Sequence, residues 1–155
     1  MKKYRMFGII LGIFLCAVLS GCGDTKQGKS DLEDGYYTAQ MKDYSHGWKE
    51  FVTICVMDNK IVSVEYNARN AAGFIKSWDS AYMRNMNSQV GNYPNRYTRK
   101  YAAQLLEKQG ADDIDMLAGA SSSGSNFEKL AAAVLDHAKT GDTNIAEVVA
   151  ESEKE

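Results

Sequence analysis

The sequence is poor in the residues that stiffen or crosslink small proteins. It holds three cysteines and one proline in 155 residues. Cys16 lies in an apolar leader and Cys22 directly follows it, so only Cys55 remains and no disulfide framework is possible. The alternating pattern around Cys55 predicts a buried thiol. A net charge of −2 and a pI of about 5.7 give no electrostatic basis for binding nucleic acid.

No apolar run in the chain is long enough to cross a membrane comfortably. The longest, residues 6–19, falls short of the roughly 20 residues that a spanning helix needs. It follows a positive start and ends in Leu19-Ser20-Gly21 before Cys22, which is typical of a secretory signal peptide. The placement of Cys22 resembles a bacterial lipobox. That resemblance implies a signal peptide at 1–21, lipidation of Cys22, and anchoring to the extracytoplasmic face of the cell membrane; the alternative is a plain signal peptide with a chance cysteine.

The mature chain divides into a polar tether, a folded part and a polar tail. Residues 22–33 are small and charged, which predicts a flexible lipidated tether. Residues 34–142 form the predicted domain, and 143–155 a frayed polar tail. Alternating segments predict strands at 36–41, 49–57 and 61–66, with a two-residue turn at 58–59. Helical spacing follows at 77–86, at 95–108 and after residue 125. Strands followed by helices predict an α+β domain with an antiparallel meander.

Residues 115–130, DMLAGASSSGSNFEKL, combine a run of small residues with the start of an amphipathic helix. Ser125 and Glu128 match a capping box, which places the helix start at Ser125. Residues 119–124 would then form a loop before a helix N-terminus, where unpaired N–H groups and the helix dipole attract phosphate. The competing interpretation is a Ser/Gly turn that only caps the helix.

Residues 115–121, Asp-Met-Leu-Ala-Gly-Ala-Ser, resemble the Asp-x-x-Ser/Thr-Gly-Ala-Thr signature of the FMN-binding domain family. That family includes subunits of sodium-pumping quinone reductases and related membrane electron-transfer complexes. The likeness extends over about residues 34–142, with further matches at 34–37, 47–49, 58–62, 73–79 and 141–142. It is greatest to flavin lipoproteins of Gram-positive bacteria that carry extracellular electrons.

The resemblance implies a non-catalytic electron carrier with FMN as cofactor. In the family, a flavin transferase joins FMN to the last hydroxyl of the signature, which is Ser121 here. Asp115 would serve the transferase or local geometry; Gly119 and Ala120 would line the path of the phosphate, and Ser123 would hydrogen-bond it. Because Ala118 and Ser121 depart from the signature, non-covalent FMN on the same loop stays open. Electrons would come from a membrane dehydrogenase or quinol.

Two other function classes stay open on the sequence alone. One is a non-redox lipoprotein binding module with the same fold that has lost flavin, and the other is a small flavin-dependent reductase. Trp78, Tyr82 and Tyr66 are candidates to stack on a flavin ring, although aromatic residues in such patterns more often belong to the core. His46 and His137 lack partners at metal-ligand spacing, so we expect no metal site.

Overall fold

The computed structural model describes residues 32–150, and these form the predicted α+β domain. The elements follow one another as strands β1 (Gly35–Met41), β2 (Lys49–Met57) and β3 (Lys60–Arg69), the short 3-10 helix η1 (Lys76–Trp78), helices α1 (Ser80–Val90), α2 (Pro94–Lys108) and α3 (Ser121–Thr140), and strand β4 (Ala146–Val148). The signal peptide, Cys22 and most of the tether lie outside the described residues.

The sheet has the order β3-β2-β1-β4. Strands β1, β2 and β3 form the predicted antiparallel meander. Asp58 and Asn59, with φ of 51° and 58°, make the tight turn between β2 and β3, where both residues need positive φ. One extra residue in β3 shifts the register beside Cys55 and Val56. Val62 is this extra residue and is exposed, whereas Tyr66 further along β3 is buried.

Strand β4 corrects the prediction of a polar tail at 143–155. Residues 146–148 pair in parallel with β1, with Ala146 opposite Ala39, and Ala146 is buried. Three residues are too few to show a period, and the partner strand lies about a hundred residues earlier in the chain. The sequence of residues 143–155 therefore predicts neither the strand nor its pairing with β1.

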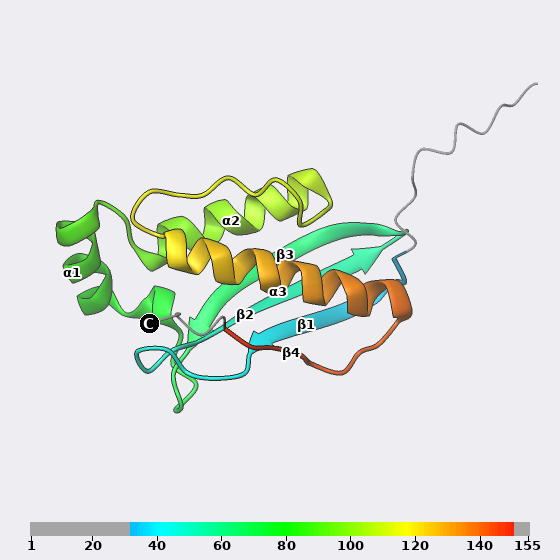
Figure 1. The fold of residues 1–155 in the computed structure, drawn as a ribbon, viewed down its shortest axis with the longest axis horizontal. Helices are drawn as coiled ribbons and strands as arrows, with labels where there is room; N and C mark the ends of the chain where they lie inside the picture. Colours follow the sequence, from blue (N-terminus) through cyan, green and yellow to red (C-terminus); the bar gives the residue numbers. More distant parts are fainter. Residues whose placement is uncertain (1–31, 151–155) are drawn as a thin grey trace, which may run out of the picture.

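Helices α2 and α3 lie side by side on one face of the sheet (Figure 1). The core between them and the sheet includes Val52 and Ile54 of β2, Tyr101 of α2 and Phe127 of α3. On the opposite face Tyr36 and Met57 are exposed. Cys55 is buried as predicted, although it alternates with the core-facing residues of β2.

Helix α3 runs the length of the sheet (Figure 1). Its end lies beside the start of the described chain, where the N–H of Glu33 donates to the carbonyl of Ala138 at 2.8 Å. Its beginning, at Ser121, is therefore at the other end of the domain. Within residues 32–150, no helix has the length and apolar character needed to cross a membrane.

Candidate functional site

Helix α3 begins at Ser121, four residues before the predicted start. Its N-cap is Ala120, which supplies no side-chain cap, and Ser125 lies inside the helix. The capping-box prediction is therefore wrong, and residues 121–124 form the first helical turn rather than a loop. The reason is tertiary: Gly124 is buried, and a Cβ there would collide with Tyr101 and Met116. This close approach to α2 determines the helical conformation of a segment whose local signals favour a turn.

The turn before α3 is held by α2 and by the end of α1. The hydroxyl of Tyr101 accepts from the N–H of Leu117 at 3.0 Å and donates to the carbonyl of Ala120 at 3.2 Å. The buried Asn92 donates to the carbonyl of Ala118 at 2.9 Å. Gly119 has φ of 74°, and a Cβ there would lie 2.7 Å from the carbonyl oxygen of Val90. These contacts hold the turn through its backbone. The side chains of Ser121 and Ser122, which follow the turn, are exposed to solvent.

The predicted site residues fall into two environments. Ser121 is the first residue of α3 and is exposed, whereas Ala120 is buried. Asp115 lies in the exposed segment before the turn, with its carboxylate 3.6 Å from the Lys108 ammonium. Ser123 is half-buried and its Oγ donates to Glu50 Oε1 at 2.8 Å. The hydroxyl proton of Ser123 is therefore used in a hydrogen bond to a carboxylate and is not donated to a ligand.

Glu50 is the main functional candidate that the sequence did not indicate. It lies on the helix-facing side of β2 and is buried, with Oε2 accepting from Asn126 Nδ2 at 2.8 Å. A buried carboxylate is costly unless hydrogen bonds satisfy it, and both oxygens are satisfied here by α3. The positive end of the α3 dipole also favours this charge. The contacts join residues 73 and 76 positions apart in the chain, so no local sequence pattern predicts them.

Two tyrosines surround this carboxylate. The hydroxyl of Tyr66 donates to the carbonyl of Ser123 at 2.8 Å. Burial, reinforced by the charge of Glu50, raises the pKa of Tyr66 well above its ordinary value. Burial likewise raises the pKa of Tyr97, with Glu50 and Tyr82 as further causes. The phenols of Tyr66 and Tyr97 therefore stay neutral at the start of α3.

A second group of side chains, the aromatic–lysine cluster, consists of Trp48, Tyr82 and Lys76. The rings of Trp48 and Tyr82 meet edge to face, with centroids 6.1 Å apart. The Lys76 ammonium is 4.9 Å from the Tyr82 ring centroid and 5.9 Å from that of Trp48. All three residues are half-buried and come from separate segments: the loop before β2, η1 and α1.

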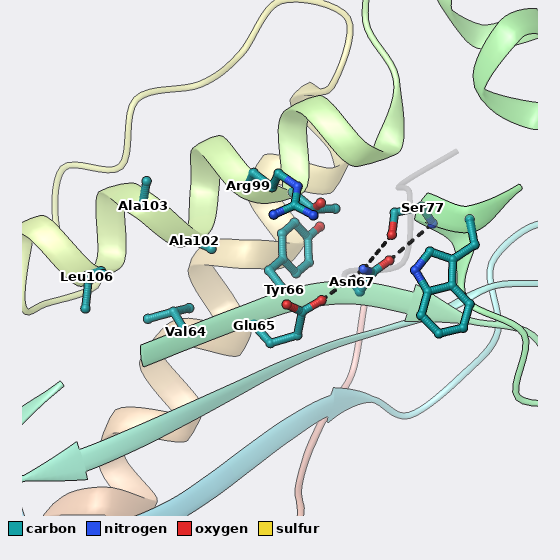
Figure 2. Close-up of a pocket in the computed structure, with 11 residues that line it drawn as sticks. Val64, Glu65, Tyr66, Asn67, Ser77, Arg99, Ala102, Ala103 and Leu106 are labelled. Atoms are coloured by element: carbon teal, nitrogen blue, oxygen red, sulfur yellow. Dashed lines mark hydrogen bonds between the residues drawn. The ribbon is translucent and has the colours of Figure 1, made fainter. Parts of the chain in front are cut away.

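A groove of about 470 Å³ lies between β3 and α2. Figure 2 shows Arg99 of α2 facing Tyr66 and Glu65 of β3. The buried Asn67 donates to Glu65 Oε1 at 3.0 Å and to Ser77 Oγ at 2.9 Å, so its amide is satisfied within the protein. The remaining lining is largely apolar and comprises Val64, Trp78, Thr98, Ala102, Ala103 and Leu106.

The three aromatic candidates of the sequence separate in the structure. Tyr66 is buried in the core, Trp78 is 69% exposed at the groove, and Tyr82 belongs to the aromatic–lysine cluster. His46 contacts Ser45, and His137 lies 3.1 Å from the carbonyl of Asn144. Within 32–150, no three His, Cys, Asp or Glu side chains are grouped so that they could hold a metal ion.

No protein-family model matches this sequence. A 15 kDa lipoprotein of Treponema pallidum is 33% identical over 114 residues, which cover 73% of this chain and 81% of the relative. The chain belongs to this lipoprotein family. The sequence likewise predicted a lipoprotein, and Cys22, the residue that would carry the lipid, lies outside the described residues.

Two solved structures resemble this lipoprotein-family chain. A crystal structure of a Clostridium perfringens protein has a TM-score of 0.73 and 37% identity, and the match covers 77% of this chain and 99% of that one. A solution NMR structure from Clostridium thermocellum has a TM-score of 0.48 and 28% identity, covering 74% of this chain and 95% of that one. The first shows that the same α+β domain occurs as a nearly whole chain in another protein.

Proposed function

We propose that this chain is a lipid-anchored flavoprotein of the extracytoplasmic membrane face that carries electrons on one FMN joined to Ser121. Membership of a lipoprotein family supports the anchor. The resemblance of residues 115–121 to a flavin-attachment signature supports the cofactor. The observation that carries the proposal is the position of Ser121, an exposed hydroxyl at the first residue of α3.

The residues at the start of α3 fit a phosphoester of FMN. The first N–H groups of any helix lack helical acceptors, and Ala120 supplies no side-chain acceptor for them. They are available to phosphate oxygens, and the helix dipole favours the negative charge. Gly119 and Ala120 place no large side chain on the approach to Ser121. FMN would supply the redox chemistry, while the protein supplies attachment and electrostatics.

The charge of Glu50 favours covalent over non-covalent FMN. Its carboxylate is bound to Ser123 and Asn126 in the first two turns of α3. A phosphate held only by the helix N-terminus would be repelled by this nearby charge. A phosphoester needs no such affinity, because the covalent bond keeps the phosphate in place.

Attachment would follow the chemistry that the family resemblance implies, with FAD as donor and a flavin transferase as catalyst. Ser121 Oγ bonds to the phosphorus on the FMN side of FAD, the pyrophosphate bond breaks, and AMP leaves. The hydroxyl proton passes to solvent or to the leaving AMP. Asp115 is exposed and close in sequence, which suits a contact with the transferase. A membrane dehydrogenase or quinol is proposed as the electron donor.

The proposal is tested by intact-mass spectrometry of the full chain co-expressed with a flavin transferase. We expect a mass increase of one FMN in the wild type and in Ser121→Thr, and none in Ser121→Ala. Ser122→Ala removes the neighbouring exposed hydroxyl and should keep the increase. A colourless wild-type protein of unchanged mass would overturn the flavin proposal.

The groove between β3 and α2 favours a second candidate, a lipoprotein that binds a small ligand without redox chemistry. The groove combines apolar lining with Arg99 and Glu65, as expected of a ligand site. Visible absorbance of the purified protein separates the two candidates. A flavin spectrum supports the first, whereas a colourless protein that retains a small molecule supports the second.

A further inference from the structure

The aromatic–lysine cluster lies at the same end of α3 as Ser121. Trp48 precedes Glu50 by two residues, and residues two apart along an extended chain point to the same face. Two residues span about 7 Å of strand. Since Glu50 contacts the first turns of α3, Trp48 lies just beyond the start of that helix.

Tyr82 places the other half of the cluster in the same region. Its ring centroid lies 6.1 Å from that of Trp48, so Tyr82 of α1 shares the position of Trp48 beside the start of α3. The cluster is therefore bounded by Trp48 on the sheet side and by α1 on the other, with the start of α3 nearby. All three members are half-buried, so part of each side chain is accessible to a ligand.

We infer that the aromatic–lysine cluster is the seat of the isoalloxazine ring of an FMN carried on Ser121. This inference rests on the proposed function. The ring is planar and aromatic, and the side chains of Trp48 and Tyr82 offer the offset or edge contacts that such rings prefer. The ribityl chain would join the phosphate on Ser121 to the ring at the cluster.

The charge of Lys76 would change the midpoint potential of a flavin ring bound at the cluster. Its ammonium is held beside both rings and is a positive charge in a half-buried position. Reduction of a flavin adds negative charge to the ring system, and a nearby cation stabilises that charge. Lys76 is thus a positioning and tuning residue that raises the midpoint potential of the bound flavin.

The test uses the full chain loaded with FMN, with loading verified by intact mass and folding by circular dichroism. Trp48→Phe keeps an aromatic ring but removes the indole, which quenches excited flavin by donating an electron. We expect a severalfold rise in flavin fluorescence. Trp78→Leu is the control, because Trp78 is the exposed tryptophan at the groove, and its flavin fluorescence should equal that of the wild type.

The charge is tested separately with Lys76→Met, which keeps most of the side-chain length. We expect a lower flavin midpoint potential, whereas Lys60→Met, at the first residue of β3, should leave it unchanged. Unchanged fluorescence in Trp48→Phe together with an unchanged potential in Lys76→Met would overturn the seat while leaving attachment at Ser121 intact. A fluorescence rise in Trp78→Leu alone would instead place the ring at the groove. A wild type without added mass overturns both proposals.

Discussion

At the scale of single residues, the start of α3 is organised around one buried charge. Ser123 and Asn126 donate hydrogen bonds to the two oxygens of the buried Glu50 carboxylate. Burial and this charge together disfavour ionisation of the neighbouring phenols of Tyr66 and Tyr97. Their protons are thus held more tightly in the folded protein than in the unfolded chain, and the stability of the domain depends on pH through these two groups.

Tyr97→Phe tests this dependence. Since burial raises the pKa of Tyr97 above 10.0, its contribution to the free energy of unfolding is complete below pH 10 and is lost as pH rises further. We expect Tyr97→Phe to make the decline above pH 10 shallower, because the variant has no phenol to ionise. Urea unfolding across this range measures it, with the exposed Tyr44→Phe as control. An equally steep decline in Tyr97→Phe would contradict the assignment.

At the scale of elements, those that depend on local sequence signals were predicted correctly, whereas those that depend on contacts between distant segments were missed. The bounds of β2 and the turn at 58–59 follow from alternation and local turn chemistry, and both were predicted from sequence. The start of α3 was missed because Gly124 packs against Tyr101, a contact between distant segments that outweighs the Ser125 capping signal. Strand β4 and the partners of Glu50 were missed for the same reason, since each depends on segments far apart in sequence.

A pair of substitutions in α3 separates these two influences on the helix start. Gly124→Ala should destabilise the domain by about 1–3 kcal/mol, because overpacking against Tyr101 and Met116 exceeds the gain in helix propensity. Ser125→Ala should be neutral or slightly stabilising, because Ser125 is an exposed residue inside the helix. Urea unfolding followed by circular dichroism measures both. A loss of about 1 kcal/mol in Ser125→Ala would instead indicate a true N-cap.

At the scale of the whole molecule, helix α3 connects the two ends of the domain. The chain toward Cys22 leaves from beside the last turn of α3, where Glu33 bonds to Ala138. Ser121 lies at the other end of a helix of 20 residues, which spans about 30 Å. Figure 1 shows this arrangement, with α3 running from yellow at its start to orange beside β1. The start of the described chain and Ser121 therefore lie at opposite ends of the domain.

This polarity predicts that membrane anchoring and flavin attachment are compatible. The full lipidated chain, bound to phosphatidylcholine vesicles, should accept FMN from FAD and a soluble flavin transferase about as fast as the same chain in detergent. Intact-mass spectrometry over time gives both rates, and Ser121→Ala on vesicles supplies the baseline. Attachment that proceeds in detergent but stops on vesicles would mean that the membrane covers the start of α3. In that case Ser121 would have to be modified before the protein reaches the bilayer.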